Sequence, residues 1–464
     1  MTAQVCFTFS ALLLFLGLHS FTTYPLSLRW LTRGRHRSSE PPASEPAPAA
    51  SVAICVCAYN EAATIERKIE NMLALRDRIG RLEILVYVDA SSDRTAELLE
   101  PYKGEITLIV SPTRTGKVQG MNLLVERATA EIVVFTDANV IIEETAIEAL
   151  ARGFDDPRVG CVCGHLVYVN EDTPTAAVGS LYWRLEEHIK KYESKAGAVM
   201  GADGSIFALR RSLHRPVPLH LLDDMFLSLS ALCDGYRVVR AGSALAFEKS
   251  VTAPAEEFYR KIRIACQAFN GHRVLWPRIR RLPPAVVYMY VSHKLLRWLS
   301  IYSLALSTFA AGIGLSALGV PYTATAAAAL ALVGLLWWAG ARRLAPFAQI
   351  REILIALLGA GIGVVEAFRG ERYQTWSPAS SNRDSLGMGG IHSRPRPWPL
   401  FERMPKASHG KPPLFRPGSG APDRAREFRS PENAVGEDAA KDAAGTAAVL
   451  GPSASSAHPP PPLR

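Results

Sequence analysis

Three short apolar runs in the first third of the chain each end in polar residues. The runs are residues 52–58, 82–88 and 132–136. Continuous apolar runs of this length predict strands that are covered on both faces. In an open parallel sheet the ligand lies beyond the carboxyl ends of the strands, so the polar residues there are expected to line one metal-compatible crevice. These residues are Tyr59-Asn60-Glu61, Asp89 and Asp137-Ala138-Asn139.

Segments with apolar residues at helical spacing alternate with these runs. Helices are predicted to begin near Ile65, Thr95 and Lys117. Strands that alternate with helices of this length predict an α/β domain with right-handed crossovers and a parallel sheet. Later elements are expected to close the crevice: a strand at 161–169, a helix at 175–196, a glycine-rich segment at 197–209 and a helix from Asp224.

Three nearly uncharged stretches have about the 20 residues that a helix needs to cross a bilayer. They are residues 5–26, 298–318 and 322–340. A fourth apolar stretch, residues 353–365, lies between Glu352 and Glu366 and is short for a crossing, which favours an interfacial or re-entrant helix. If this stretch did cross, the C-terminus would lie on the other side of the membrane.

Basic residues beside these stretches predict the orientation of the chain. Residues 1–4 carry no basic residue, unlike a cleaved signal peptide, so the first stretch is expected to remain in the protein. Three crossings place the arginines of residues 29–37 on the same side as the basic residues that flank the later stretches. The positive-inside rule makes that side cytoplasmic, in an inner or plasma membrane. The flanking residues are Lys294, Arg297, Arg342 and Arg343.

Changes in composition divide the chain into six parts. They predict a transmembrane helix, a basic and proline-rich linker, an α/β catalytic domain, amphipathic interfacial helices, a second transmembrane or interfacial region, and a disordered tail. The corresponding boundaries are 1–28, 29–50, 51–250, 251–297, 298–370 and 378–464.

The formal net charge of +9 is concentrated at the predicted membrane borders. Anionic lipid headgroups explain such clusters more simply than nucleic acid, for which no motif is present, so membrane lipids are the expected partner. The cysteines include Cys55 with Cys57 and Cys161 with Cys163, each pair inside an apolar run. Both sulfurs of a pair lie on one strand face, and a cytoplasmic domain keeps thiols reduced, which favours buried small hydrophobes over zinc ligands.

Oxygen-bearing side chains follow two of the predicted strands. Asp137 and Asn139 could hold a divalent cation that bridges a diphosphate, because Mg²⁺ and Mn²⁺ prefer hard oxygen ligands and share them with phosphates. In isolation, such a tripeptide is more often a turn or a helix N-cap. Asp89, at the end of the preceding strand, is favoured for function, whereas Ser92 or Asp93 could cap the next helix.

Several charged residues leave two interpretations open. Asp223 and Asp224 would be favourable at a helix N-terminus in any protein, but one that projected into the crevice could take a proton from a hydroxyl. Three basic residues could stabilise a departing diphosphate or face lipid headgroups. These are Arg260, Lys261 and Arg263. Lys117 lacks the rest of a phosphate loop and no G-x-G-x-x-G follows a strand, which disfavours Walker-type ATPases and dinucleotide-binding dehydrogenases.

Taken in order, residues 52–297 resemble the membrane-embedded family 2 glycosyltransferases, a group that includes hyaluronan, chitin and cellulose synthases and exopolysaccharide enzymes. The agreement of motif order, β/α pattern and flanking spans makes the resemblance specific. Trp376-Ser377-Pro378 is similar to the family's closing signature. The other segments are Ala58-Tyr59-Asn60-Glu61, Asp89-Ala90-Ser91-Ser92-Asp93, Gly116-Lys117 with Asn122, Asp137-Ala138-Asn139, Gly201-Ala202-Asp203-Gly204, Leu222-Asp223-Asp224 and Arg260-Lys261-Ile262-Arg263.

The resemblance implies a GT-A (Rossmann-like) fold and a nucleotide-sugar donor, most often UDP-linked, with Mg²⁺ or Mn²⁺. Asp224 would be the general base that deprotonates an acceptor hydroxyl, so that an α-linked donor is inverted to a β-glycoside. Arg263 would support the leaving diphosphate, and such charge stabilisation commonly contributes about 3 kcal/mol. The donor-binding residues would be Tyr59, Glu61, Asp89, Lys117 and Asp137, with Asp137 and Asn139 at the metal.

The sequence departs from the family pattern at two motifs. Asn139 stands where the family has its second metal-motif acid, and residues 260–264 lack the Gln and Trp of Q-x-x-R-W. The preferred interpretation is a membrane glycosyltransferase that acts on a polysaccharide or lipid-linked acceptor. The alternatives are a polyprenyl-phosphate glycosyltransferase and a non-catalytic membrane assembly component that retains the fold.

Overall fold

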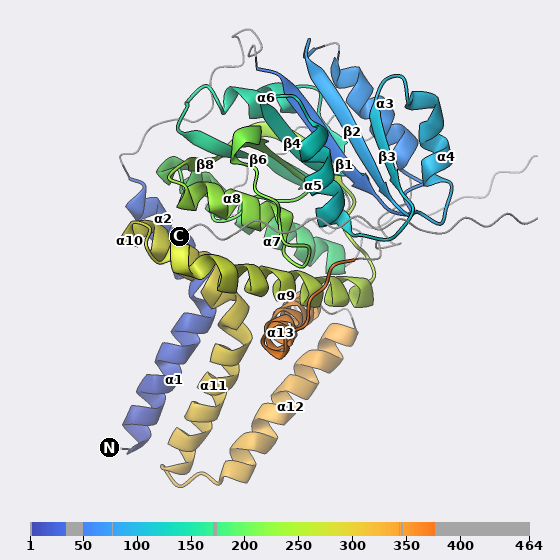
Figure 1. Ribbon diagram of the computed structural model, residues 1–464. Coiled ribbons are helices and arrows are strands. Elements are labelled where there is room, and N and C mark those ends of the chain that lie inside the picture. The colour runs from blue at the N-terminus through green and yellow to red at the C-terminus, as the bar shows by residue number, and fades with distance from the viewer. Residues whose placement is uncertain are drawn as a thin grey trace, which may run out of the picture. The chain divides into compact units, whose positions relative to one another are not determined.

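The computed structural model describes residues 2–33, 50–76, 78–169, 174–342, 344 and 347–375. Most of the predicted linker, the Trp376-Ser377-Pro378 signature and the predicted tail lie outside these residues. The described residues form an α/β domain with apolar helices before and after it in the sequence (Figure 1).

An eight-stranded sheet lies at the centre of the α/β domain. Its strands are β1 (Val52–Ala58), β2 (Leu82–Asp89), β3 (Thr107–Ser111), β4 (Ile132–Asp137), β5 (Ile141–Ile142), β6 (Val159–Tyr168), β7 (Ile206–Arg210) and β8 (Arg237–Glu248). They lie in the order β3-β2-β1-β4-β7-β6-β8-β5. The predicted α/β fold class is confirmed.

The three apolar runs form the parallel part of this sheet. Strand β1 lies between β2 and β4, and Val52 is in register with both Leu82 and Ile132. Every residue of β1 is buried, as its continuous apolar sequence predicts. Because the three strands start level and run in the same direction, Asp89 and Asp137 end at the same edge of the sheet.

Alternate residues of β1 pack into two hydrophobic cores. Cys55 and Cys57 belong to one core, and Cys161 and Cys163 of β6 lie in the same core. All four are buried free thiols, as their positions in apolar strands predict.

The second half of the sheet is mixed, whereas the parallel crossovers were predicted from the first half. Strand β7 is antiparallel to both β4 and β6. The glycine-rich segment before β7 lies at the carboxyl edge of β4, where Ile206 pairs with Thr136. A strand that begins at this edge can only run back along the sheet.

Helices cover the sheet and connect it to the apolar segments. In the α/β domain they are α3 (Ile65–Arg76), α4 (Thr95–Leu99), η1 (Glu100–Tyr102), α5 (Lys117–Arg127), α6 (Ala146–Arg152), α7 (Pro174–Ala196), η2 (Arg211–Leu213) and α8 (Asp223–Cys233). The remaining helices are α1 (Thr2–His19), α2 (Thr23–Leu31), α9 (Pro254–Ile279), α10 (Pro284–Tyr290), the π-helical η3 (Val291–Leu295), α11 (Leu296–Ser316), α12 (Tyr322–Ala341) and α13 (Phe347–Arg369). In Figure 1, α1, α11 and α12 extend away from the α/β domain on the far side of α9.

Three helical segments among the described residues are long and apolar enough to cross a membrane: Pro284–Ser316, Tyr322–Ala341 and Phe347–Arg369. The first predicted span is different, because the helix bends by 66° between Ala3–His19 and Thr23–Leu31. Tyr24 and Leu28 of the second piece are fully buried. Packing of α2 onto the protein therefore ends the straight helix seven residues earlier than the predicted boundary at residue 26.

The expectation that residues 353–365 are too short to cross was wrong about the helix, because α13 has 23 residues. In Figure 1, however, α13 is seen nearly end-on while α1, α11 and α12 run lengthwise. Helix α13 packs on α9 through Gly359 and Gly363, and on α11 through Gly361.

Candidate active site

A cavity of about 950 Å³ opens at the carboxyl edge of the parallel strands and extends to α9 and α11. Nearly all of the candidate site residues line it. They are Glu61, Lys117, Asp137, Asn139, Asp224 and Arg263. Tyr59 and Asp89 do not line the cavity directly, and their contacts explain why.

The Asp89 carboxylate is fully buried and holds the loop that precedes α5. Its Oδ1 accepts hydrogen bonds from Thr115 N at 2.7 Å and Thr115 Oγ1 at 3.0 Å, and its Oδ2 accepts one from Gly116 N at 2.9 Å. Arg114 Nη1 lies 2.5 Å from Oδ2. Asp89 therefore positions the start of α5, and with it Lys117.

The polar segment that follows β1 is hydrogen-bonded to the one that follows β2. Asn60 adopts a left-handed conformation with φ of 53°, and its Oδ1 accepts a hydrogen bond from Ser92 N at 2.8 Å. The guanidinium carbon of Arg114 lies 3.0 Å from the centre of the Tyr59 ring. Tyr59 thus packs against the loop that Asp89 holds.

Glu61 accepts hydrogen bonds at the start of α3, and Asp93 accepts one at the start of α4. Glu61 O accepts the Thr64 and Ile65 N–H groups, and its carboxylate accepts Thr64 Oγ1 at 3.0 Å. Asp93 accepts hydrogen bonds from Thr95 N and Ala62 N, both at 3.0 Å. The capping interpretation of Asp93 is confirmed, and Glu61 combines a helix start with a place in the cavity wall.

Lys117 lies among three carboxylates. Its Nζ is 2.6 Å from Asp137 Oδ1 and 4.0 Å from Asp223 Oδ2. Burial would lower the pKa of Lys117, but Asp137, Asp223 and Asp224 outweigh it and raise the pKa. Lys117 is therefore a permanent cation at the centre of the acidic edge.

A second lysine, which sequence reasoning missed, holds the turn at residues 137–139 that follows β4. Lys68 of α3 is fully buried, and its Nζ donates to Thr136 Oγ1 at 3.1 Å and to Val140 O at 2.6 Å. Burial lowers the pKa of Lys68 to about 7. These two hydrogen bonds lie on either side of Asp137 and Asn139 and fix the ends of the turn.

The Asn139 amide contacts another residue that sequence reasoning missed. Its Nδ2 donates to Glu248 Oε1 at 3.0 Å, and Glu248 also lines the cavity. Burial and the charge of Asp137 raise the pKa of Glu248 to about 7. No sequence pattern marks Glu248, because it comes from the end of β8, 109 positions along the chain.

Asp223 and Asp224 form the first turn of α8, and they differ in surroundings. Asp223 is buried, and its Oδ2 has no hydrogen-bond partner among the described residues. Asp224 lines the cavity, where burial and the charges of Asp223 and Asp203 raise its pKa to about 7. A carboxylate with this pKa can both accept a proton near neutral pH and release it again.

Two of the three basic residues of α9 share one counter-ion. Glu257 lies 2.7 Å from Arg260 Nε and 3.3 Å from Lys261 Nζ. Arg263 Nη1 instead donates to Gln267 Oε1 at 3.2 Å. Burial and the neighbouring Arg260 lower the pKa of Arg263 to about 10, so it is still charged at neutral pH. Because its hydrogen-bond partner Gln267 is neutral, the guanidinium charge of Arg263 suits an incoming phosphate.

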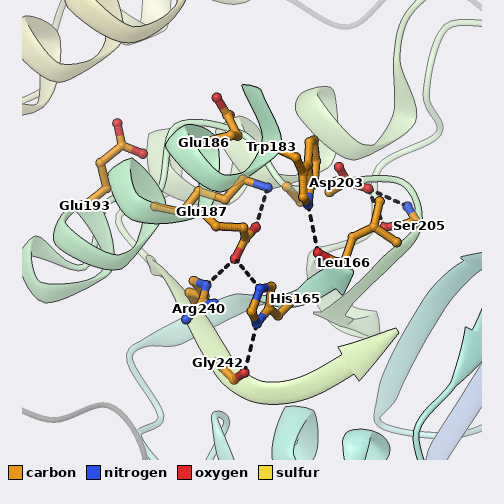
Figure 2. A network of polar contacts seen from close by, with 12 residues as sticks. His165, Leu166, Trp183, Glu186, Glu187, Glu193, Asp203, Ser205, Arg240 and Gly242 are labelled. Carbon is orange, nitrogen blue, oxygen red and sulfur yellow. Dashed lines mark hydrogen bonds and ion pairs between the residues drawn. The ribbon is translucent and has the colours of Figure 1, made fainter. Parts of the chain in front are cut away.

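The wall opposite the parallel strands is built on α7. Glu187 accepts from Arg240 Nε at 2.6 Å and lies 3.8 Å from His165 Nε2, as Figure 2 shows. Trp183 Nε1 donates to Leu166 O at 2.9 Å in the same view. These contacts join α7 to β6 and β8, so that Trp183 and Lys190 are held in the cavity lining.

Glu186 of α7 binds η3 and the start of α11. Glu186 lies 3.0 Å from His293 Nε2, 3.1 Å from Lys294 Nζ and 2.5 Å from Arg297 Nη1. The π-helical turn η3 brings successive residues closer to one face than an α-helix would. Lys294 and Arg297, which the sequence places beside a predicted span, are both bound by the buried Glu186 carboxylate.

The residues present fit a divalent cation that is shared with a substrate. Among the described residues, no three His, Cys, Asp or Glu side chains converge on one point. The donors around Asp137 are instead two carboxylates and an amide, those of Asp137, Glu248 and Asn139. An all-oxygen set with few carboxylates suits Mg²⁺ or Mn²⁺ when phosphates supply the other ligands.

Comparisons with known proteins agree with this geometry. The family described as Glycosyl transferase family 2 matches residues 53–217. An N-acetylglucosaminyltransferase of Mesorhizobium japonicum is 25% identical over 263 residues, which are 53% of this chain and 62% of that protein. A poly-beta-1,6-N-acetyl-D-glucosamine synthase of Staphylococcus aureus is 27% identical over 195 residues, which are 40% of this chain and 47% of that protein. The matches thus span about half of these curated relatives.

One solved structure shows the same fold. A mannosyltransferase of Pyrobaculum calidifontis, in complex with GDP-Man and Mn²⁺, superposes with a TM-score of 0.61 at 22% identity, covering 79% of this chain and 100% of its own. The α/β domain is thus GT-A-like, as the resemblance implied. From the matched motifs and this fold, the chain carries a family 2 glycosyltransferase domain, together with apolar helices that could span a membrane.

Proposed function

We propose that this protein transfers an N-acetylhexosamine, most simply N-acetylglucosamine from its UDP-linked form, to a polysaccharide or lipid-linked acceptor at a membrane. The names of the two relatives support the sugar. The observation that carries the proposal is the convergence of three features on one cavity: a partly buried carboxylate with a pKa of about 7, a metal-compatible turn with an acid, and an arginine whose hydrogen-bond partner is the neutral Gln267. These are Asp224, Asp137 with Asn139, and Arg263.

Asp224 is the proposed general base. It removes the proton from the acceptor hydroxyl as the hydroxyl oxygen attacks the anomeric carbon, and the bond from that carbon to the diphosphate breaks on the opposite face. The product is inverted, and the proton stays on the Asp224 carboxylate until it is lost to water. A base with a pKa close to the working pH is suited to this step.

The leaving diphosphate needs positive charge at its oxygens. Lys117 and Arg263 are the proposed protein cations, on α5 and α9 respectively. A divalent cation held at Asp137 and Asn139 would neutralise the diphosphate charge when bound. Tyr59, Glu61 and Asp89 would then place the nucleoside, with Asp89 acting through the loop before α5 rather than by direct contact.

The acceptor is proposed to enter from the side of the apolar helices. Trp298 and Arg297 of α11 and Tyr182 of α7 line that end of the cavity. Aromatic rings suit the apolar faces of sugar rings, and the position beside α11 suits an acceptor that is held at a membrane. The proposed location is an inner or plasma membrane with the catalytic domain on the cytoplasmic side.

A donor survey with the full chain in lipid bilayers tests the proposal. UDP-, GDP- and dTDP-sugars are supplied with Mn²⁺ and candidate acceptors, and nucleotide release and product size are measured beside Asp224→Asn. Release from one donor that requires Asp224 is expected, and a ladder of products would show polymerisation. One sugar on a polyprenyl phosphate would favour that alternative. Folded protein that neither binds nor cleaves any donor would contradict the proposal.

A further inference from the structure

We propose that Glu248 is a metal ligand that takes the place of the acid missing at Asn139. This inference rests on the proposed function, because it concerns the cation that binds the donor diphosphate. It assigns a role to a residue that lies far from the Asp-x-Asn motif in the sequence.

The sheet register brings Glu248 to this turn. Strand β5 pairs antiparallel with β8, and Ile141 is the partner of Phe247. The chain that leaves Asp137 must therefore pass the end of β8 before β5 begins. Continued by one residue, this register places Val140 opposite Glu248, and Asn139 directly precedes Val140, so its side chain is within reach of the Glu248 carboxylate.

The contact between the two side chains orients the amide. Asn139 Nδ2 donates to Glu248 Oε1 at 3.0 Å. An amide nitrogen cannot ligate a metal, so this hydrogen bond directs the nitrogen to Glu248 and leaves Oδ1 as the end of the amide that can. Asp137, Asn139 and Glu248 all line the same cavity, where a diphosphate would complete the coordination.

Charge gives the chemical reason for a second acid. One oxygen of Asp137 is 2.6 Å from Lys117 Nζ, so part of its charge is already neutralised. A neutral amide adds no charge to the site. Mg²⁺ and Mn²⁺ are usually held by one or two carboxylates together with substrate phosphates, and Glu248 restores the second carboxylate that the motif lacks.

Substitution by glutamine separates ligation from a purely structural role. In Glu248→Gln the side-chain carbonyl can still accept the Asn139 hydrogen bond, so a structural role would survive. The negative charge and the stronger ligand are lost. The double variant N139D/E248Q exchanges the acid and the amide, and it keeps a hydrogen bond between the two positions with the donor reversed.

Mn²⁺ binding is measured by electron paramagnetic resonance on the full chain in lipid nanodiscs, with UDP present and no acceptor. For E248Q we expect Mn²⁺ affinity to fall at least about tenfold, while N139D/E248Q regains affinity to within about threefold of the parent. Glu131→Gln, at the opposite end of β4, is the matched control and should leave the affinity unchanged. Thermal unfolding without metal shows whether each variant is folded.

The outcomes distinguish this inference from the proposed function. If the parent binds Mn²⁺ with UDP, Asp137→Asn abolishes binding, and E248Q binds as the parent does, then Glu248 is not a ligand and the proposed function stands. If E248Q and N139D/E248Q lose affinity equally, the exchange has failed and the assignment is overturned. If the parent itself binds no Mn²⁺, the metal part of the proposed function fails with it.

Discussion

The two walls of the cavity hold their charged groups in different ways. On the donor wall, formed by the ends of β1, β2 and β4, the Asp89 carboxylate is held by the backbone N–H groups of Thr115 and Gly116. On the membrane-side wall, formed by α7 with η3 and α11, Glu186 is held by the side chains of Lys294 and Arg297. Backbone N–H groups thus add to the Arg114 guanidinium in holding Asp89, whereas the contacts that hold Glu186 come from side chains.

This difference predicts which property each wall controls. A carboxylate held by backbone N–H groups keeps its place as long as its strand and loop are folded, so changes there should alter ligand binding and rate. A buried charge held only by other charges leaves them unpaired when it is removed, which costs stability. Substitutions on the donor wall should therefore affect catalysis, and those on the membrane-side wall should affect folding.

The largest expected effect is on catalysis, at the first turn of α8 beside the donor wall. Asp224→Asn removes the proposed base and should lower the transfer rate about 10³-fold, while unfolding temperature and donor affinity stay near those of the parent. Initial rates of nucleotide release with acceptor, and equilibrium donor binding, measure the two properties. An unchanged rate would remove Asp224 from the mechanism.

The next effect should be on stability at the membrane-side wall. Glu186→Gln leaves the buried Arg297 and the half-buried Lys294 without their shared carboxylate, and the free energy of unfolding should fall by about 3 kcal/mol. Denaturant unfolding in a fixed lipid mixture measures it. The matched control is Glu97→Gln, which removes an exposed partner of Arg94 and should leave the free energy of unfolding almost unchanged. Equal costs for the two variants would break the comparison between the walls.

A smaller effect is expected where the donor wall meets the nucleoside. Asp89→Asn keeps the size of the side chain, but it replaces one carboxylate oxygen with an NH₂ group. This group cannot accept the hydrogen bonds that the facing backbone N–H groups donate. Donor affinity should fall about 30-fold, since charge-assisted hydrogen bonds contribute about 2 kcal/mol. Titration with the nucleotide alone measures this loss. Ser111→Ala, at the exposed end of neighbouring β3, should leave donor affinity unchanged.

The smallest effect is a gradual dependence on pH. The ionised form of Asp224 is the active base, and its raised pKa of about 7 leaves it protonated in acid. The value of kcat/KM should therefore rise about tenfold per pH unit below pH 7 and level off above it. Asp224→Asn should lack this limb. A limb that persists in the variant would assign the titration to another group.

The sequence predicted that the acids of the donor wall lie together, because the end of an apolar strand can be recognised from local sequence. Asp89 and Asp137 directly follow apolar runs, and parallel register brings such ends together. Glu248 and Lys68 could not be found in this way, since their contacts depend on the pairing of β5 with β8 and on the depth of α3. The roles predicted for the site residues remain predictions, to be tested by the variants above.

The contacts of the membrane-side wall were not predicted from the sequence, for a different reason. Lys294 and Arg297 were interpreted from their position beside an apolar stretch, which is a one-dimensional argument. Whether these cations face lipid or protein depends on Glu186 of α7, which lies more than 100 residues earlier in the chain. Nothing in the sequence of α7 indicates that Glu186 binds them. The bend after His19 was missed similarly, because both halves of that segment are apolar and only packing of Tyr24 separates them.

The glycines of α13 have a mechanical consequence. A Cβ at Gly363 would collide with Ile262 O of α9, and one at Gly361 would come within 2.5 Å of Ile301 of α11. Backbone therefore touches backbone one residue before Arg263, with no flexible side chain between them to absorb a shift. Any tilt or sliding of α13 against α9 would therefore move the backbone that carries Arg263, because the two helices have no deformable layer between them at this point.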